Sequence, residues 1–285
     1  MPLKDILDKL YACRSRRHLE NDPLSFCHRY EDPLDQEIVG LVASSLAYGN
    51  VLSIKRSVER VLQVISPFPR RFIENYDPFR CRRLLDGFRH RFNDGRDLCA
   101  LFLAIKSMID QDDSIGSYFL RFYDGKAEDV TSMLTGFTAA VLAMDYSPVF
   151  GSRQPPKDSY FSFFFPSPAS GSACKRLCMY LRWMVRPADG IDLGLWQEIP
   201  PKMLIIPVDA HIRKISLLLG LTARRQADWK MAREITAALR QFDPLDPVKY
   251  DFSLCHIGIS EGCIGREGAA CLDCVLAESC GAVET

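Results

Sequence analysis

Four cysteines near the end of the chain carry the plainest chemical signal in the sequence. Cys263, Cys271, Cys274 and Cys280 have the spacing C-x7-C-x2-C-x5-C, with no histidine between them. Four thiolates on short loops are typical ligands of a [4Fe–4S] cluster or of a structural zinc ion. A zinc ribbon pairs two C-x2-C knuckles, whereas this segment contains one. The spacing therefore favours an iron–sulfur cluster, and a zinc site stays open as the alternative.

A lysine and an aspartate open two of the expected helices. Residues 174–186 (CKRLCMYLRWMVR) have an amphipathic pattern, and Lys175 lies in the first turn, after a connection of small residues. That connection contains Gly171 and Ser172 and can bring backbone N–H groups close to a phosphate. Asp209 directly precedes an apolar-periodic run that ends at Gly220, which is the position of a helix N-cap. A solvated lysine and a simple cap are the ordinary interpretations of Lys175 and Asp209.

Positive charge is concentrated in one part of the sequence. Over the whole chain the 36 lysines and arginines balance the 36 aspartates and glutamates. Residues 55–96 contain eleven basic and five acidic residues, and residues 97–149 contain three and eight. On a helical projection Arg182 lies within about 40° of Lys175, which predicts a shared basic face on that helix. Such faces attract phosphates, and an arginine-rich solvated surface is the alternative interpretation.

The hydrophobic pattern predicts a mostly α-helical protein. Apolar residues recur at three- and four-residue spacing, and turn-forming pairs separate the segments. Helices are expected over residues 37–47, 174–186, 209–219 and 228–241, and a last one starts near Pro247. The aromatic run over residues 160–165 fits either a short strand or a buried loop.

The composition limits the class of protein. With 47% apolar and 25% charged residues the chain can bury a core, which excludes intrinsic disorder. No run of about 18 apolar residues occurs, and charges near the N-terminus leave no apolar core for a signal peptide. We therefore expect a cytoplasmic protein that does not bind membranes, in which clustered cysteines bind metal instead of forming disulfides.

Three parts of the sequence resemble the helix-hairpin-helix DNA glycosylases. The cysteine tail is similar to the iron–sulfur loop that closes endonuclease III and related adenine glycosylases, with the first gap one residue longer. Residues 207–212 (PVDAHI) are similar to the V-D-T-H-[IV] signature, and residues 171–175 (GSACK) resemble the G-x-G-x-K end of the hairpin. The chain also resembles a bacterial family without assigned function in that superfamily, through CKRL-x-MxLRWMVR and LIIP-x-D-x-H.

The resemblance implies an all-α, two-lobed helix-hairpin-helix fold with a C-terminal iron–sulfur loop. Residues 35–205 would form the central lobe with a divergent hairpin, and residues 1–34 plus 206–285 would form the second lobe. Double-stranded DNA would bind in the cleft between the lobes. The four cysteines would hold the [4Fe–4S] cluster.

The resemblance also implies an activity: excision of a damaged base from DNA, with AP-lyase strand cleavage, by a monomer associated with the bacterial nucleoid. Lys175 would be the nucleophile that forms a Schiff base, and Asp209 would stabilise the positive charge that develops at the deoxyribose C1′. The long gap between Lys175 and Asp209 is more like that of archaeal 8-oxoguanine glycosylases, which favours an oxidised purine as the substrate.

DNA contacts are expected in two places. The residues of the hairpin and the following helix that would contact DNA are Gly171, Ser172, Arg176 and Arg182. Tyr48 and Asn50 occupy the position of the family's intercalating loop, so either side chain is a candidate wedge that fills the gap left by the extruded base. An ordinary turn is the alternative interpretation of residues 48–50.

Departures from the family pattern leave other functions open. Ala173 stands in place of the second hairpin glycine, Lys214 replaces an arginine common in the family, and residues 66–150 have no counterpart. The second possibility is a protein with the same fold but without catalytic activity. It would be an iron–sulfur protein that binds DNA or RNA. A zinc-stabilised interaction module is the third possibility.

Overall fold

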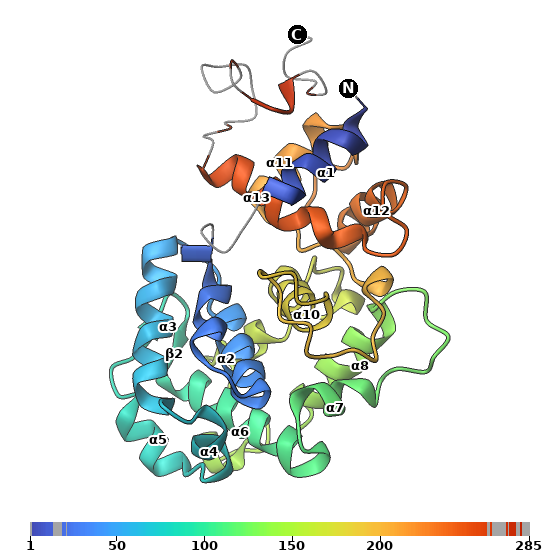
Figure 1. The fold of residues 1–285 in the computed structure, drawn as a ribbon. Coiled ribbons are helices and arrows are strands. Elements are labelled where there is room, and N and C mark those ends of the chain that lie inside the picture. Colours follow the sequence, from blue (N-terminus) through green and yellow to red (C-terminus); the bar gives the residue numbers. More distant parts are fainter. Residues whose placement is uncertain are drawn as a thin grey trace. The chain divides into compact units, whose positions relative to one another are not determined.

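The chain divides into two compact units in the computed structural model, which describes residues 2–13, 19–20, 22–260, 263, 272, 274–277 and 280. We call Leu19–Ser167 the central unit, and Met1–His18 together with Pro168–Thr285 the terminal unit. The described residues are mostly helical and contain one two-stranded hairpin, as Figure 1 shows. The expected predominance of helix is therefore confirmed. The boundaries at residues 18/19 and 167/168 differ from those expected at 34/35 and 205/206.

The central unit consists of helices joined by short loops. Its α-helices are α2 (Pro33–Ser45), α3 (Val51–Ile65), α4 (Pro69–Glu74), α5 (Pro78–Leu84), α6 (Gly95–Asp112), α7 (Ile115–Leu120), α8 (Thr131–Leu142) and α9 (Ser147–Phe150). The strands β1 (Arg89–His90) and β2 (Asn93–Asp94) form an antiparallel hairpin before α6. Two 3₁₀ helices, η2 (Pro23–Arg29) and η3 (Phe161–Phe164), lie near the two ends of the unit.

Short polar side chains set where these helices begin. The Asp32 carboxylate accepts a hydrogen bond from the Leu34 N–H at 2.8 Å, and Pro33 occupies the first turn of α2, where its missing N–H costs nothing. The helix expected over residues 37–47 is α2, and it starts earlier because of this cap. Asp77 and Pro78 open α5 in the same way.

The helix α6 forms the centre of the unit. A reciprocal capping box between Asp94 and Asp97 fixes its start, and the left-handed backbone of Asp113, with φ of 64°, ends it. The helix packs against α4, α5 and α7, and the residues from Leu98 to Phe102 are all buried. A helix enclosed on all sides shows little amphipathic pattern, which is why its sequence gives a weaker signal than that of α3.

A buried polar network ties the β-hairpin to the segment before η3. The Asn93 side chain donates to the Asp97 carboxylate and to the Tyr160 carbonyl, both at 2.9 Å. Ser159 donates to the other oxygen of Asp97 at 2.6 Å. The aromatic run that follows is a 3₁₀ turn with Phe161 buried, so the interpretation of residues 160–165 as a strand is wrong.

The terminal unit combines the two ends of the chain. Its helices are α1 (Leu3–Cys13), η4 (Pro168–Ser170), α10 (Lys175–Val185), η5 (Pro201–Met203), α11 (Ala210–Leu218), α12 (Trp229–Arg240), η6 (Pro247–Tyr250) and α13 (Asp251–Ser260). The first helix packs against α13 and η6, which are far away in the sequence (Figure 1). The Tyr250 hydroxyl donates to the Asp8 carboxylate at 2.8 Å across this contact.

The helices expected over residues 174–186, 209–219 and 228–241 are confirmed as α10, α11 and α12. Asp209 caps α11 and Asp228 caps α12, and each accepts a hydrogen bond from the backbone N–H three residues further on. The last expected helix begins at Pro247 as the 3₁₀ turn η6 and continues as α13.

Candidate active site

Two arginines on α10 are buried among carboxylates. Arg182 is 3% exposed; its Nε donates to Asp192 at 3.2 Å, and its Nη1 donates to Asp251. Arg186 is 2% exposed and pairs with Asp192, with Asp189 at 3.0 Å and with Asp246 at 2.9 Å. These carboxylates raise the pKa of Arg186 and keep the guanidinium charged in spite of its burial.

Arg182, which is predicted to share a basic face of α10 with Lys175, is buried in the structure, and this burial counts against its expected contact with DNA. A guanidinium enclosed by two carboxylates has no surface to offer to a phosphate. Arg176 is also buried, at 6% exposure. The helical projection relates Arg182 to Lys175 on one face of α10, but it could not show which acidic residues pack on that face.

Asp251, the first residue of α13, is one of the titratable groups that this network perturbs. Its side chain is buried, and burial raises its pKa to about 7, against the opposing effect of the ion pair with Arg182. The negative charge of Asp209 contributes to this increase. A carboxyl group that changes protonation near neutral pH in this way is typical of a functional site.

Asp209 lies close enough to Asp251 for their charges to interact, because α11 and α13 pack against each other. One oxygen of Asp209 accepts from the Ile212 N–H at 2.7 Å, and the other faces the Cys255 thiol, whose Sγ lies at 3.4 Å. The carboxylate is half-buried and fixed in one orientation. The structure thus joins Asp209, Asp251 and Arg182 into one charged site.

Lys175 is the first residue of α10 and half-buried. It precedes Arg182 by two helical turns, about 10 Å along the axis, and lies on nearly the same face. The backbone before Lys175 turns sharply, with positive φ of 77° at Gly171 and 47° at Cys174.

The turn before α10 uses several of its polar groups within the protein. The Gly171 N–H donates to the Pro168 carbonyl at 2.9 Å, and the Gly171 carbonyl accepts from the Trp229 N–H at 3.1 Å. The Ser172 hydroxyl accepts from the Cys174 N–H at 3.2 Å. Phosphate binding by Gly171 and Ser172 stays a prediction, with fewer free donors than the sequence indicates.

Tyr48 and Asn50 flank the turn between α2 and α3. The Tyr48 hydroxyl donates to Asn93 at 2.6 Å, and its ring lies edge-on against His90. The Asn50 side chain is exposed and caps α3 by accepting from the Leu52 N–H at 2.9 Å. The wedge role stays a prediction; Tyr48 would have to break its hydrogen bond to leave this position, whereas Asn50 would only release a helix cap.

The cysteine tail lies partly outside the described residues, and Cys271 is one of those left out. Cys263, Cys274 and Cys280 are of intermediate exposure and form no disulfide with one another, and the Cys263 carbonyl accepts from Lys214 Nζ at 3.3 Å. Among the described residues no group of three or more metal-ligating side chains is gathered. The donor set of four thiols without histidine fits an iron–sulfur cluster in its chemistry.

The chain belongs to a protein family described as "Protein of unknown function (DUF2400)", whose model matches residues 22–260. The match spans all of the central unit except its first residues and continues through α13. No curated protein and no solved structure is significantly similar to the chain. In the described part of the chain, no helix is long and apolar enough to cross a membrane.

The titration of Asp251 gives a prediction for stability. We expect the free energy of unfolding of the wild-type protein, relative to Asp251→Asn, to fall as the pH rises from about 4 to about 7. In this window the unfolded chain has lost the proton that the folded protein still holds, so a higher pH favours unfolding. Each pKa unit corresponds to about 1.4 kcal/mol, and the whole decline should be a few kcal/mol.

Urea denaturation of both proteins at about pH 4, 6 and 8 measures this difference. The asparagine variant keeps the size and shape of the side chain and removes its titration together with the ion pair to Arg182. A difference in unfolding free energy that stays constant across the three pH values would contradict the raised pKa of Asp251.

Proposed function

We propose that the chain is a DNA base-excision glycosylase with AP-lyase activity, acting on a damaged base in double-stranded DNA. The observation that carries the proposal is the placement of Asp209, whose carboxylate is fixed at the start of α11 and interacts with the buried pair of Arg182 and Asp251. The resemblance of residues 207–212 and of the cysteine tail to the helix-hairpin-helix glycosylases supports the same conclusion.

Asp209 would act on the charge that forms when the base leaves. Departure of the base with the electrons of the glycosidic bond leaves positive charge at C1′, and a carboxylate already in place stabilises it without reorganisation. The hydrogen bonds from Ile212 and Cys255 hold both Asp209 oxygens in position. Asp251 is buried and would act through Asp209 as a positioning residue.

Lys175 would act as the nucleophile. Its amine would form a bond to C1′ as the base departs, and loss of protons from the nitrogen would open the sugar ring to a Schiff base. Removal of a C2′ proton would then break the 3′ C–O bond by β-elimination, which is the lyase step. An oxidised purine is the lesion that we propose first, from the long separation between Lys175 and Asp209 in the sequence.

The cysteines would hold a [4Fe–4S] cluster. Its ligands would be Cys263, Cys271, Cys274 and Cys280, and when bound it would stabilise the C-terminal segment rather than take part in base removal. Absorbance near 400 nm in anaerobically purified protein separates this cluster from a zinc site, which is colourless.

Borohydride trapping tests the proposed activity. We expect the anaerobically purified protein to form a covalent adduct with a duplex that contains 8-oxoguanine, because borohydride reduces the Schiff base. Duplexes with thymine glycol or an abasic site complete the panel. Lys175→Ala should form no adduct. Lys230→Ala removes an exposed lysine from the first turn of α12 and should trap as much DNA as the wild type.

Absence of an adduct on every duplex would overturn the lyase part of the proposal. Release of the damaged base without an adduct, detected by alkaline cleavage, would leave a glycosylase that works through Asp209 alone. An adduct that persists in Lys175→Ala would assign the nucleophile to another amine.

A non-catalytic nucleic-acid-binding protein is the second candidate. The observation that favours it is that both oxygens of Asp209 are already engaged, one by the Ile212 N–H and the other by the Cys255 thiol, which suits a helix cap without a catalytic role. In this case Lys175→Ala and Asp209→Asn would bind DNA as tightly as the wild type, and no lesion would be processed.

A further inference from the structure

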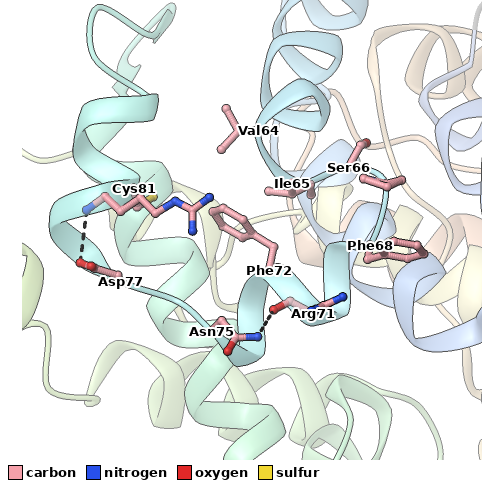
Figure 2. Close-up of a pocket in the computed structure, with 11 residues that line it drawn as sticks. Val64, Ile65, Ser66, Phe68, Arg71, Phe72, Asn75, Asp77 and Cys81 are labelled. Carbon is pink, nitrogen blue, oxygen red and sulfur yellow. Dashed lines mark hydrogen bonds between the residues drawn. The ribbon is translucent and has the colours of Figure 1, made fainter.

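The central unit contains a pocket that the proposed activity does not use. It lies between the end of α3, the helix α4 and the start of α5, and has a volume of about 470 Å³ (Figure 2). Volumes of this size are typical of small-molecule sites. Figure 2 shows the Phe72 ring in the pocket, with Phe68 on the side of α3 and Asp77 on the opposite side.

The pocket has an excess of positive charge. Arg71 and Arg80 line it, both side chains are exposed, and neither belongs to an ion pair within the described residues. The acid in the lining, Asp77, is committed to the cap of α5, where it accepts from the Phe79 N–H at 2.8 Å and from the Arg80 N–H at 3.2 Å. Two uncommitted guanidinium groups are the donors that phosphate oxygens bind best.

Aromatic rings lie beside these arginines. Phe68 is 58% exposed, which is unusual for a side chain of this size and leaves a ring face open to a ligand. The Phe72 ring packs edge-to-face against the ring of Phe102, with 5.6 Å between the two ring centroids. Rings and guanidinium groups together recognise a flat base and its phosphate, because the base stacks while the phosphate pairs.

We propose that this pocket binds a phosphorylated nucleoside unit, with the phosphate on Arg71 and Arg80 and the base against Phe68 or Phe72. The unit is either a free mononucleotide or part of a nucleic-acid strand. The proposal does not rest on the proposed glycosylase activity, because the pocket belongs to the central unit and Lys175 and Asp209 belong to the terminal unit.

The test measures binding of three probes to the full chain: AMP, inorganic phosphate and a fluorescein-labelled deoxythymidine decamer. We expect Arg71→Ala/Arg80→Ala to weaken nucleotide binding at least about tenfold, and Phe68→Ala about fivefold or more. The matched control, Arg56→Ala/Arg153→Ala, removes two exposed arginines of the same unit outside the pocket and should stay within about twofold of the wild type.

The three probes identify the source of the ligand. AMP bound as tightly as the decamer supports a free nucleotide, and a decamer that binds more tightly through the same arginines supports a strand. Equal losses in the pocket and control variants would overturn the proposal, since binding would then follow net charge alone. Inorganic phosphate bound as tightly as AMP would also overturn it, and so would no binding of any probe.

The same titration with Asp209→Asn separates this proposal from the proposed function. Unchanged AMP binding by that variant is expected whether or not the protein excises bases. A loss of AMP binding in Asp209→Asn would contradict the assignment of the ligand to the central unit.

Discussion

Replacement of Arg182 by alanine is expected to destabilise the folded protein by about 3–5 kcal/mol, which is a large part of the stability of an ordinary domain. The loss of stability comes from the buried carboxylates of Asp192 and Asp251, which both lose Arg182 as a partner. Asp192 keeps its pair with Arg186, whereas Asp251 has Arg182 as its one ion-pair partner among the described residues. A buried charge without a partner is far more costly than the pair itself is stabilising.

Urea denaturation at about pH 9 measures the effect, because Asp251, with its pKa of about 7, is then ionised beside Arg182. Arg29→Ala serves as the control. Arg29 pairs with Glu59 at 2.8 Å, but both side chains are about half exposed, so the loss should be below about 1 kcal/mol. The double variant Arg182→Ala/Asp251→Asn should regain part of the lost stability, because it removes the unpaired charge. Equal losses in Arg182→Ala and Arg29→Ala would show that the α10 network contributes no more than a surface pair.

Much of the local structure of the terminal unit follows from the sequence. The helices α10, α11 and α12 begin within one residue of the expected positions. Their apolar residues recur with the helical period, and an aspartate precedes α11 and α12 in the position of an N-cap. Helical periodicity and N-caps depend on residues that are close together in the sequence. They can therefore be recognised without knowledge of the tertiary structure.

The charged site could not be predicted in the same way, because its members come from separate segments. Arg182 lies on α10, Asp192 in an irregular segment and Asp251 at the start of α13, and pattern analysis does not show that these meet. One indication was present: Asp251 is the one carboxylate in the mostly apolar helix Asp251–Ser260. A helix that is apolar on all sides is buried, so its single carboxyl group has to find a partner in the interior.

The arginine-rich segment, residues 55–96, shows where positive charge is concentrated in the sequence, but not what each arginine contacts in the folded protein. Of its arginines, Arg71 and Arg80 line a pocket, whereas Arg60 donates to the Asp86 carbonyl at 2.8 Å. The count of charges in residues 55–96 cannot separate these roles, because it contains no information on which side chains face one another. The proposed phosphate site therefore rests on the pocket and not on the net charge of the segment.

Replacement of Asp209 by asparagine is expected to slow base removal by about 100- to 1000-fold, the loss typical of a group that stabilises charge in the transition state. Asparagine is as good an N-cap as aspartate, so α11 should keep its start and the protein its stability. The substitution therefore isolates the negative charge from the structural role of the side chain. Single-turnover release of the base, on the duplex that gives the borohydride adduct, measures the rate.

Asp228→Asn is the matched control for this substitution. Asp228 caps α12 as Asp209 caps α11, and it accepts from the Met231 N–H at 2.8 Å, so the same change of charge and cap occurs at a different helix. Its rate should equal that of the wild type. Asp209→Asn should also lower the pKa of Asp251, because the Asp209 charge is one cause of its increase. If both variants retain the wild-type rate, Asp209 is a helix cap only, and the chemistry of this site has to be assigned to other residues.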